Sequence, residues 1–244
     1  MGNTVSMEMT GNQENLNTAY APENMEERLT QAKNAYYHSA TDEALIEARK
    51  LFLDLGDYKN SADFVRKCDR LLEFQEGKTV EFGSWNGTPI RWKVLQAKGK
   101  NHLLFAENVI TGHAFNEERT NMFWAKCSLR KWLNHEFMNE AFTPAERMSI
   151  VFTKTFNEAN MSWSTPSGPE TRDKIFVFSH KELLEYLPEQ SDRALGEWWW
   201  TRTTGHCDLA AVTVYLDGTI YDIGLNIVDH EIGVRPAMWV MLKR

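Results

Sequence analysis

The last forty residues constrain the fold of this chain most strongly. Turn glycines and apolar residues recur there in an order that suits short strands joined by tight turns. We call this set the C-terminal frame, and it comprises Trp198, Trp199, Trp200, Arg202, Gly205, Ala210, Ala211, Val214, Asp217, Gly218, Gly224 and residues 233–240. Such a frame predicts a rigid β-rich end to the chain.

The positions between the frame residues share no chemical theme. We call them the mixed positions: His206, Cys207, Asp208, Leu209, Thr213, Tyr215, Tyr221, Asp222, Ile223, Leu225, Asn226, Asp229 and His230. Their variety matches no common catalytic motif. A rigid scaffold that carries diverse side chains is typical of a recognition surface, so we predict that these residues bind a ligand.

The frame resembles the variable region of the target proteins of diversity-generating retroelements, of the major tropism determinant type. The resemblance rests on Trp200, Arg202, Gly205, Ala210, Ala211, Asp217, Gly218, Gly224 and the closing run 233–239. It implies a C-type-lectin-like domain, related to the formylglycine-generating-enzyme fold, whose surface is diversified by an error-prone reverse transcriptase. A looser resemblance to a bacterial domain family of unknown function extends over residues 80–240.

The resemblance also implies which residue types diversification can produce. The reverse transcriptase replaces template adenines, typically those of Asn codons. These replacements cannot convert an Asn codon into a codon for Lys, Glu, Gln, Met or Trp. All the mixed positions hold residue types that can be reached in this way. Glu231 lies in the same stretch and cannot be reached, so it is either fixed or encoded by another codon.

The chain is expected to contain a helical part and a larger α+β domain. Residues 1–21 are polar and predict a disordered tail. Residues 22–76 show helical periodicity, with Gly56 ending one helix, Ser61 capping the next and Gly77 ending it, and resemble one tetratricopeptide-like unit. Residues 77–244 then form the lectin-like domain, with its variable region at about residues 198–240.

Short strands and a few helices are predicted within this domain. Strands are expected at 79–82, 90–95, 102–105, 174–178 and 233–241, helices at 128–139, from Thr143 and at 179–187, and a loop over 157–173. Asn86-Gly87 and Asp217-Gly218 are expected to form hairpin turns.

Strand alternation predicts which side chains face the ligand. Val212 and Val214 should point inward, and Thr213 and Tyr215 outward. Residues 221–223 should form an exposed loop. Of the three consecutive tryptophans, Trp199 is the one expected to border the site if any does, whereas Arg235 should be structural.

Charge and motifs weigh against several other functions. The net charge is −7, but residues 77–244 hold 19 basic and 20 acidic residues, so no basic stripe predicts nucleic-acid binding. No apolar run or basic leader predicts membrane insertion or a signal peptide, so the chain is expected to be cytoplasmic until phage assembly or another export route. We expect no cofactor and no metal. A divalent ion could in principle be bound by His206, His230, Asp208, Asp222 and Asp229, but arbitrary variation of the mixed positions better explains why His and Asp occur there.

The sequence therefore favours a non-catalytic binder of a protein or glycan. Cys207 lacks the nearby second cysteine of formylglycine-generating enzymes, and the three cysteines, Cys68, Cys127 and Cys207, predict no disulfide framework. Two alternatives remain open: a module with one fixed protein partner, and an enzyme of unknown chemistry on the same fold. The oligomeric state is also open.

Overall fold

The computed structural model describes residues 22–242, so the predicted disordered tail lies outside the described residues. The chain divides into two compact units, Met1–Cys68 and Asp69–Arg244. The division falls within helix α3 (Ser61–Glu73), earlier than the boundary near Gly77 that the end of the helical periodicity indicated.

The first unit is helical, as its periodicity predicts. It contains α1 (Pro22–His38), α2 (Asp42–Leu53) and the first part of α3. Its core includes Tyr36, Phe52 and Phe64, with the Phe52 and Phe64 rings stacked at 4.7 Å. The turn after α2 contains Gly56 at φ 55°. Ser61 is the first residue inside α3 rather than the residue before it, its hydroxyl donates to the Tyr58 carbonyl, and α3 ends at Glu73, before Gly77.

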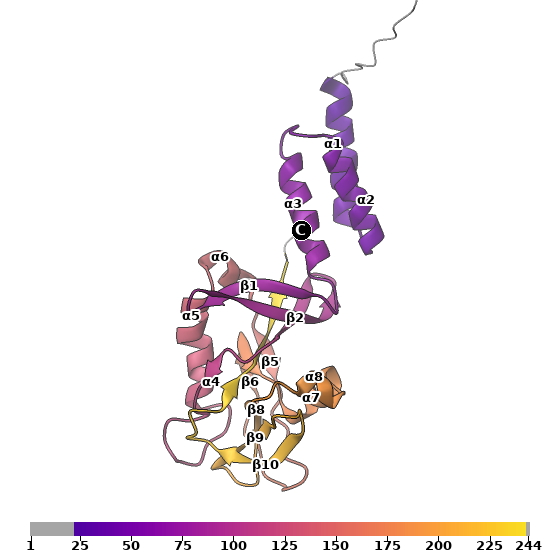
Figure 1. The fold of residues 1–244 in the computed structure, drawn as a ribbon. Coiled ribbons are helices and arrows are strands. Elements are labelled where there is room, and N and C mark those ends of the chain that lie inside the picture. The colour runs from indigo at the N-terminus through magenta and orange to yellow at the C-terminus, as the bar shows by residue number, and fades with distance from the viewer. Residues whose placement is uncertain (1–21, 243–244) are drawn as a thin grey trace, which may run out of the picture. The chain divides into compact units, whose positions relative to one another are not determined.

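The second unit is an α+β domain with two five-stranded sheets and a separate two-stranded sheet (Figure 1). The strands are β1 (Thr79–Trp85), β2 (Thr88–Lys98), β3 (Asn101–Ala106), β4 (Thr111–Gly112), β5 (Thr153–Thr155), β6 (Thr171–Asp173), β7 (Ile175–Val177), β8 (Trp199–Thr204), β9 (Ala210–Val214), β10 (Ile220–Asn226), β11 (Gly233–Val234) and β12 (Pro236–Met241). The helical segments are α4 (Ser128–Trp132), η1 (Leu133–Phe137), α5 (Met138–Ala141), α6 (Pro144–Ser149), α7 (His180–Tyr186) and α8 (Gln190–Arg193).

The first sheet has the order β1-β2-β3-β12-β7, with every neighbouring pair antiparallel. The predicted hairpin between β1 and β2 is confirmed. Its turn residues Asn86 and Gly87 both have positive φ, at 49° and 79°, as a type I′ turn requires. The C-terminal strand β12 is inserted between β3 and β7, so the end of the chain completes this core.

The second sheet has the order β10-β9-β8-β11-β4. The sequence predicted one closing strand over residues 233–241, but the chain divides it between two sheets: β11 belongs to the second and β12 to the first. Arg235 stands at the break and is buried. Its guanidinium donates to the Ala106 and Glu107 carbonyls and lies over the Phe105 and Trp199 rings, which confirms the structural role predicted for it.

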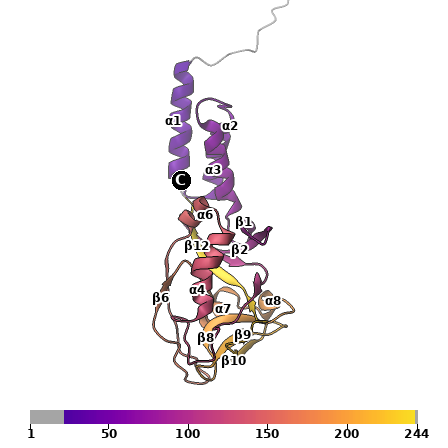
Figure 2. The ribbon, with the colours of Figure 1, turned by 90° about the vertical axis from the view of Figure 1, so that its left-hand side faces the viewer.

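The predicted helix after Ser128 is confirmed, with an unexpected π-helical turn. Segments α4, η1 and α5 follow one another without a break and pack beside the first sheet (Figures 1 and 2), where Phe137 contacts Trp85. Thr143–Glu146 and Ser179–Glu182 both form the capping boxes that their spacing predicts.

Four elements were not predicted: the short strands β4, β5 and β6, and the helix α8. The segment 157–173, expected to be a loop, ends in β6, which pairs with β5. The short helix α8 precedes the C-terminal frame. Within residues 22–242, the helices are all too short or too polar to cross a lipid bilayer.

Candidate functional site

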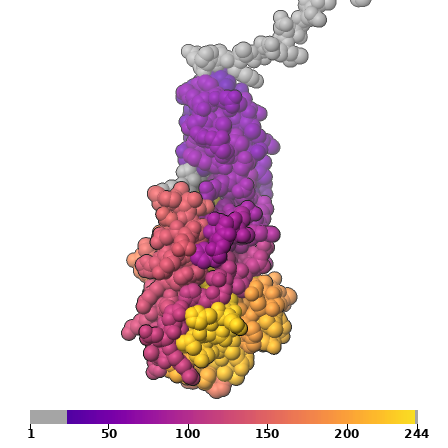
Figure 3. All heavy atoms as spheres, turned by 60° about the vertical axis from the view of Figure 1, so that its left-hand side comes forward, coloured from indigo at the N-terminus to yellow at the C-terminus, as the bar shows by residue number. Residues whose placement is uncertain are grey.

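The frame residues and the mixed positions differ in how deeply they are buried. Trp199, Trp200, Gly205, Ala210 and Ala211 are buried, as are most other frame residues except Trp198, Asp217 and Trp239. In contrast, twelve of the thirteen mixed positions are exposed or half-buried. The C-terminal residues, drawn in yellow, gather into one patch on the surface (Figure 3).

Thr213 is the exception, and the prediction that it points outward is wrong. It is 0% exposed, and the other four residues of β9 are buried as well. It pairs with Trp200 on one side and Tyr221 on the other, and Trp200 is in turn packed against Phe115. Its hydroxyl has no hydrogen-bond partner among the described residues. Thr213 therefore belongs to the core of the second sheet and not to its binding surface.

Two glycines bring the strands beneath the site close together. A Cβ on Gly205 would lie 2.4 Å from the Ile223 carbonyl oxygen, and one on Gly224 would lie 2.5 Å from the Ala211 carbonyl oxygen. Gly224 also has φ 78°, in the left-handed region that favours glycine, at the point where the pairing of β10 with β9 shifts register. These residues must be glycine if the mixed positions around them are to keep their backbone positions.

Aromatic side chains form the part of the surface nearest β8. The ring centroids of Trp198 and Tyr215 lie 4.2 Å apart, and those of Trp198 and Tyr221 lie 5.6 Å apart, both edge to face. Tyr215 is 39% exposed and Tyr221 is 36% exposed. Trp199 is buried, so Trp198, and not Trp199, is the tryptophan that borders the site.

Residues 221–223 belong to strand β10, which corrects the prediction of an exposed loop. Ile223 is still 37% exposed, because β10 is the outer strand of its sheet. The predicted exposure therefore holds for Tyr221 and Ile223, whereas Asp222 is half-buried, and a strand positions these residues more rigidly than a loop would.

The turn 206–209 lies against β10 and against a segment that the sequence reasoning did not assign to the site. The His206 amide donates to the Ile223 carbonyl at 2.8 Å, and the His206 ring meets the Trp163 ring at 6.0 Å. Trp163 is 47% exposed. Asn160 is buried nearby, and its amide donates to the Thr204 and Asp222 carbonyls. Asn160 and Trp163 thus support the site from a polar segment whose only signal was its tryptophan.

The end of β10 and the turn after it carry three further polar mixed positions, Asn226, Asp229 and His230. Asn226 and Asp229 accept hydrogen bonds from the Val228 and Glu231 amides, at 3.4 Å and 3.0 Å. These contacts are typical of Asx turns. His230 is exposed, and its Nε2 lies 3.4 Å from a Glu117 carboxylate oxygen.

A cavity of about 420 Å³ is lined in part by Asn160, the residue whose amide donates to the Asp222 carbonyl. Asn160, Met161, His180 and Leu184 contribute to its lining. Burial lowers the pKa of His180, and the nearby Asp222 carboxylate partly opposes that shift. An imidazole held neutral can donate and accept one hydrogen bond each, which suits ligand recognition.

The structure brings few potential metal ligands or nucleophiles together. Over residues 22–242, no three His, Cys, Asp or Glu side chains are grouped so that they could hold a metal ion. Cys127 is buried and caps α4, and burial raises the pKa of its thiol to about 12. Cys207 is half-buried, with its sulfur 3.5 Å from the His206 Nε2. Cys68 is buried as well.

The fold and site together define an α+β domain with a buried glycine-rich frame and a chemically mixed surface. The chain belongs to DUF6273, a family described as a domain of unknown function, whose model matches residues 99–242. This match begins directly after β2, later than the resemblance over residues 80–240 suggested. No curated protein and no solved structure matches the chain.

Proposed function

We propose that this protein is a non-catalytic binder whose C-type-lectin-like domain presents a surface diversified by a retroelement. The observation that carries this proposal is the separation of the frame from the mixed positions. The frame is mostly buried, and twelve of the thirteen mixed positions reach solvent. Diversification of a surface is tolerated only if the varied side chains do not hold the fold together.

The hydrogen bonds around the mixed positions support this separation. Backbone groups of the mixed positions make several of the contacts that organise this region. Met122 N donates to the Asp208 carbonyl, Ile227 N to the Leu209 carbonyl and Asn160 Nδ2 to the Asp222 carbonyl. Every residue type offers the same backbone carbonyl, so these contacts survive a change of side chain.

The mixed positions suit recognition chemically. Tyr215, Tyr221, Ile223 and Leu225 offer apolar area, and the rings of Tyr215 and Tyr221 contact the Trp198 ring. Exposed tyrosine and tryptophan give large contact areas at low cost in conformational entropy. Asp208, Asp222, Asn226, Asp229 and His230 then orient a ligand and reject poorly matched ones.

The proposed ligand is a protein or a glycan presented by a target cell or particle. The lectin-like fold describes the scaffold and implies neither sugar nor calcium. Several copies of the domain on one particle would raise the overall avidity, so that each single site needs only modest affinity.

The direct test is to sequence the DNA that flanks the gene, together with the 3′ end of the gene, across a population. A near-copy of the segment that encodes residues 198–240, differing from it only at adenines, would support the proposal. The variable codons should then include those of the twelve accessible mixed positions. An invariant 3′ end without a near-copy would contradict it and would favour a module with one fixed partner.

A further inference from the structure

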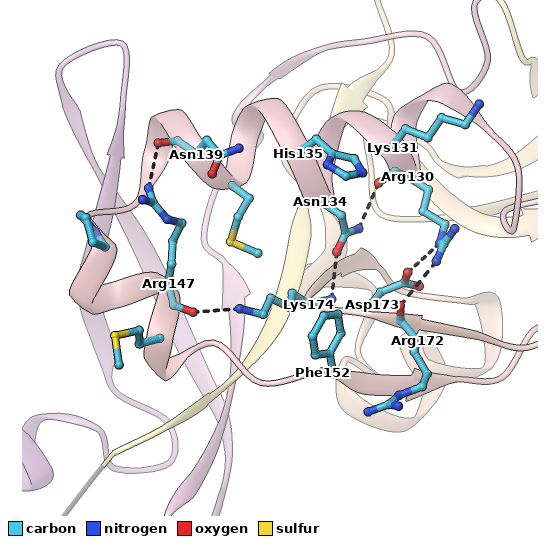
Figure 4. Close-up of a pocket in the computed structure, with 13 residues that line it drawn as sticks. Arg130, Lys131, Asn134, His135, Asn139, Arg147, Phe152, Arg172, Asp173 and Lys174 are labelled. Atoms are coloured by element: carbon cyan, nitrogen blue, oxygen red, sulfur yellow. Dashed lines mark hydrogen bonds and ion pairs between the residues drawn. The ribbon is translucent and has the colours of Figure 1, made fainter.

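A second cleft lies away from the mixed positions, where α4, η1, α5 and α6 face Phe152 and strand β6 (Figure 4). Its volume is about 590 Å³, within the range of small-molecule sites in proteins. None of the mixed positions contributes to its lining. It is therefore independent of the function proposed above.

Basic side chains dominate this cleft. Arg130, Lys131, Arg147, Arg172 and Lys174 line it, with Asp173 as the only lining carboxylate. The formal charge of the lining is thus +4 if histidine is neutral, in a domain whose residues 77–244 sum to −1. Such a concentration of positive charge attracts anions.

Asp173 does not neutralise the cleft as a whole. It is fully buried, and Arg130 binds it through Nε at 2.6 Å. Trp124 Nε1 and the Thr155 and Thr171 hydroxyls also donate to it. Among residues 22–242, no carboxylate lies within ion-pair distance of the other four cations.

Two of those cations are held in place by backbone carbonyls. Arg147 donates to the Asn139 and Phe142 carbonyls, and Lys174 Nζ donates to the Arg147 carbonyl at 3.0 Å. Figure 4 shows the Lys174 side chain crossing from the strand side towards α6. Carbonyl contacts orient these groups but leave their net positive charge uncompensated.

Apolar groups lie beside the charges. Phe152 is 61% exposed and Met148 is 70% exposed, and both line the cleft. The Arg172 guanidinium and the Lys174 ammonium lie 5.6 Å and 5.4 Å from the centroid of the Phe152 ring. The cleft thus offers positive charge and an accessible aromatic surface to the same ligand.

We propose that this cleft binds an organic phosphate that carries at least two negative charges and an aromatic or apolar group. The phosphates contact Arg172, Lys174 and Arg147, and the apolar group packs against Phe152 and Met148. A nucleoside triphosphate is a readily available probe of this chemistry. Tripolyphosphate and adenosine represent its two halves.

The test is isothermal titration calorimetry of the full chain with ATP, tripolyphosphate and adenosine. ATP should bind saturably, tripolyphosphate more weakly by about tenfold, and adenosine not at all in the millimolar range. Binding of ATP should weaken at least several-fold between about 50 and 300 mM NaCl, because salt screens the attraction. Absence of ATP binding, or equal binding of ATP and tripolyphosphate, would overturn the proposal.

Variants separate a local site from general attraction. The double variant Lys131→Gln/Arg172→Gln removes two lining charges that make no side-chain hydrogen bond among the described residues, so the fold should be retained. It should weaken ATP binding by about tenfold or more. The matched control Lys98→Gln/Arg119→Gln removes the same charge from exposed residues outside the cleft and should leave the affinity within about twofold. Equal weakening in both double variants would contradict a site in this cleft.

Discussion

Trp198 and Tyr215 meet edge to face, with their ring centroids 4.2 Å apart and their planes at 74°. The contact joins a residue of the frame to one of the mixed positions. Trp199 follows Trp198, and Val214 precedes Tyr215. These two neighbours are paired across β8 and β9, and both are buried. The boundary between the fixed core and the proposed binding surface thus passes between consecutive residues.

Replacing mixed positions should leave the fold intact. In the double variant Tyr221→Asp/Asp222→Tyr, both new residues are types that already occur among the mixed positions. We expect the free energy of unfolding to fall by about 1 kcal/mol or less, as is usual for exposed positions outside special features. Urea denaturation followed by circular dichroism measures this change. Loss of cooperative unfolding would show that these side chains are structural.

The frame glycines should behave in the opposite way. Gly224→Ala places a methyl group against the Ala211 carbonyl and at a positive φ, so we expect a loss of about 3 kcal/mol or more. Gly99→Ala is the matched control: it has a similar φ of 61° but no atom within 4 Å of the added Cβ. This control should cost only about 1 kcal/mol. Equal losses in the two variants would mean that close strand packing at Gly224 is unimportant.

Arg202 should be among the most sensitive side chains of the domain. It is buried, pairs with both carboxylate oxygens of Glu182 and donates to the Phe156 and Val177 carbonyls. Arg202→Met leaves these acceptors without their donor, and we expect a loss of about 3–5 kcal/mol in unfolding free energy.

The exposed pair of Lys154 and Glu170 provides the control for Arg202. Lys154→Met should change the unfolding free energy by about 1 kcal/mol or less, since water already solvates both partners. Thermal unfolding of both variants gives the comparison. A small effect at Arg202 would remove the reason to regard it as a structural frame residue.

The buried Thr213 hydroxyl should lower the unfolding free energy of the domain. Thr213→Val removes a buried polar group without a partner and keeps the side-chain shape, so we expect a gain of about 1 kcal/mol. Thr201 on the neighbouring strand is also buried, but its hydroxyl donates to the Val212 carbonyl at 2.9 Å. Thr201→Val should therefore lose about 1 kcal/mol. Denaturant titration of both variants measures the two changes in unfolding free energy. Changes of the same sign in both variants would contradict the prediction.

Stability should decrease in mild acid. Burial lowers the pKa of His102 and of His180 below the ordinary value of 6.5, so the unfolded chain binds protons before the folded one does. The unfolding free energy should therefore be highest above about pH 6.5 and fall as the pH decreases below it. Urea titrations at pH 7.5 and 5.5 measure the effect. The fall should be smaller in His102→Gln, and an equal fall in that variant would assign the effect to other groups.

Local signals in the sequence predicted most of the secondary structure. The Asn86-Gly87 turn, both capping boxes and the Asp217-Gly218 hairpin formed where their residue types indicated. These features depend on a few neighbouring residues, so the local sequence is enough to specify them. The chemical variety of the mixed positions also marked them as candidate surface residues, and twelve of the thirteen are accessible.

Strand alternation alone failed where both faces of a strand are covered. It placed Thr213 outside, but β9 lies between β8 and β10 and its second face is covered as well. For the same reason the buried tryptophans include both Trp199 and Trp200, and Trp198 is left at the rim. Which residues cover a strand depends on chain segments that are distant in sequence.

By itself, the sequence determined the local elements, the glycine-rich frame and the mixed character of the surface, because propensity, capping and turn chemistry act over a few residues. Only the tertiary structure decided that residues 233–241 divide between two sheets and that Trp163 joins the site. The basic cleft likewise gathers Arg130, Arg147 and Lys174 from separate segments, so no stretch of sequence shows its charge. Burial and electrostatic potential are sums over neighbours in space, and the fold alone defines those neighbours.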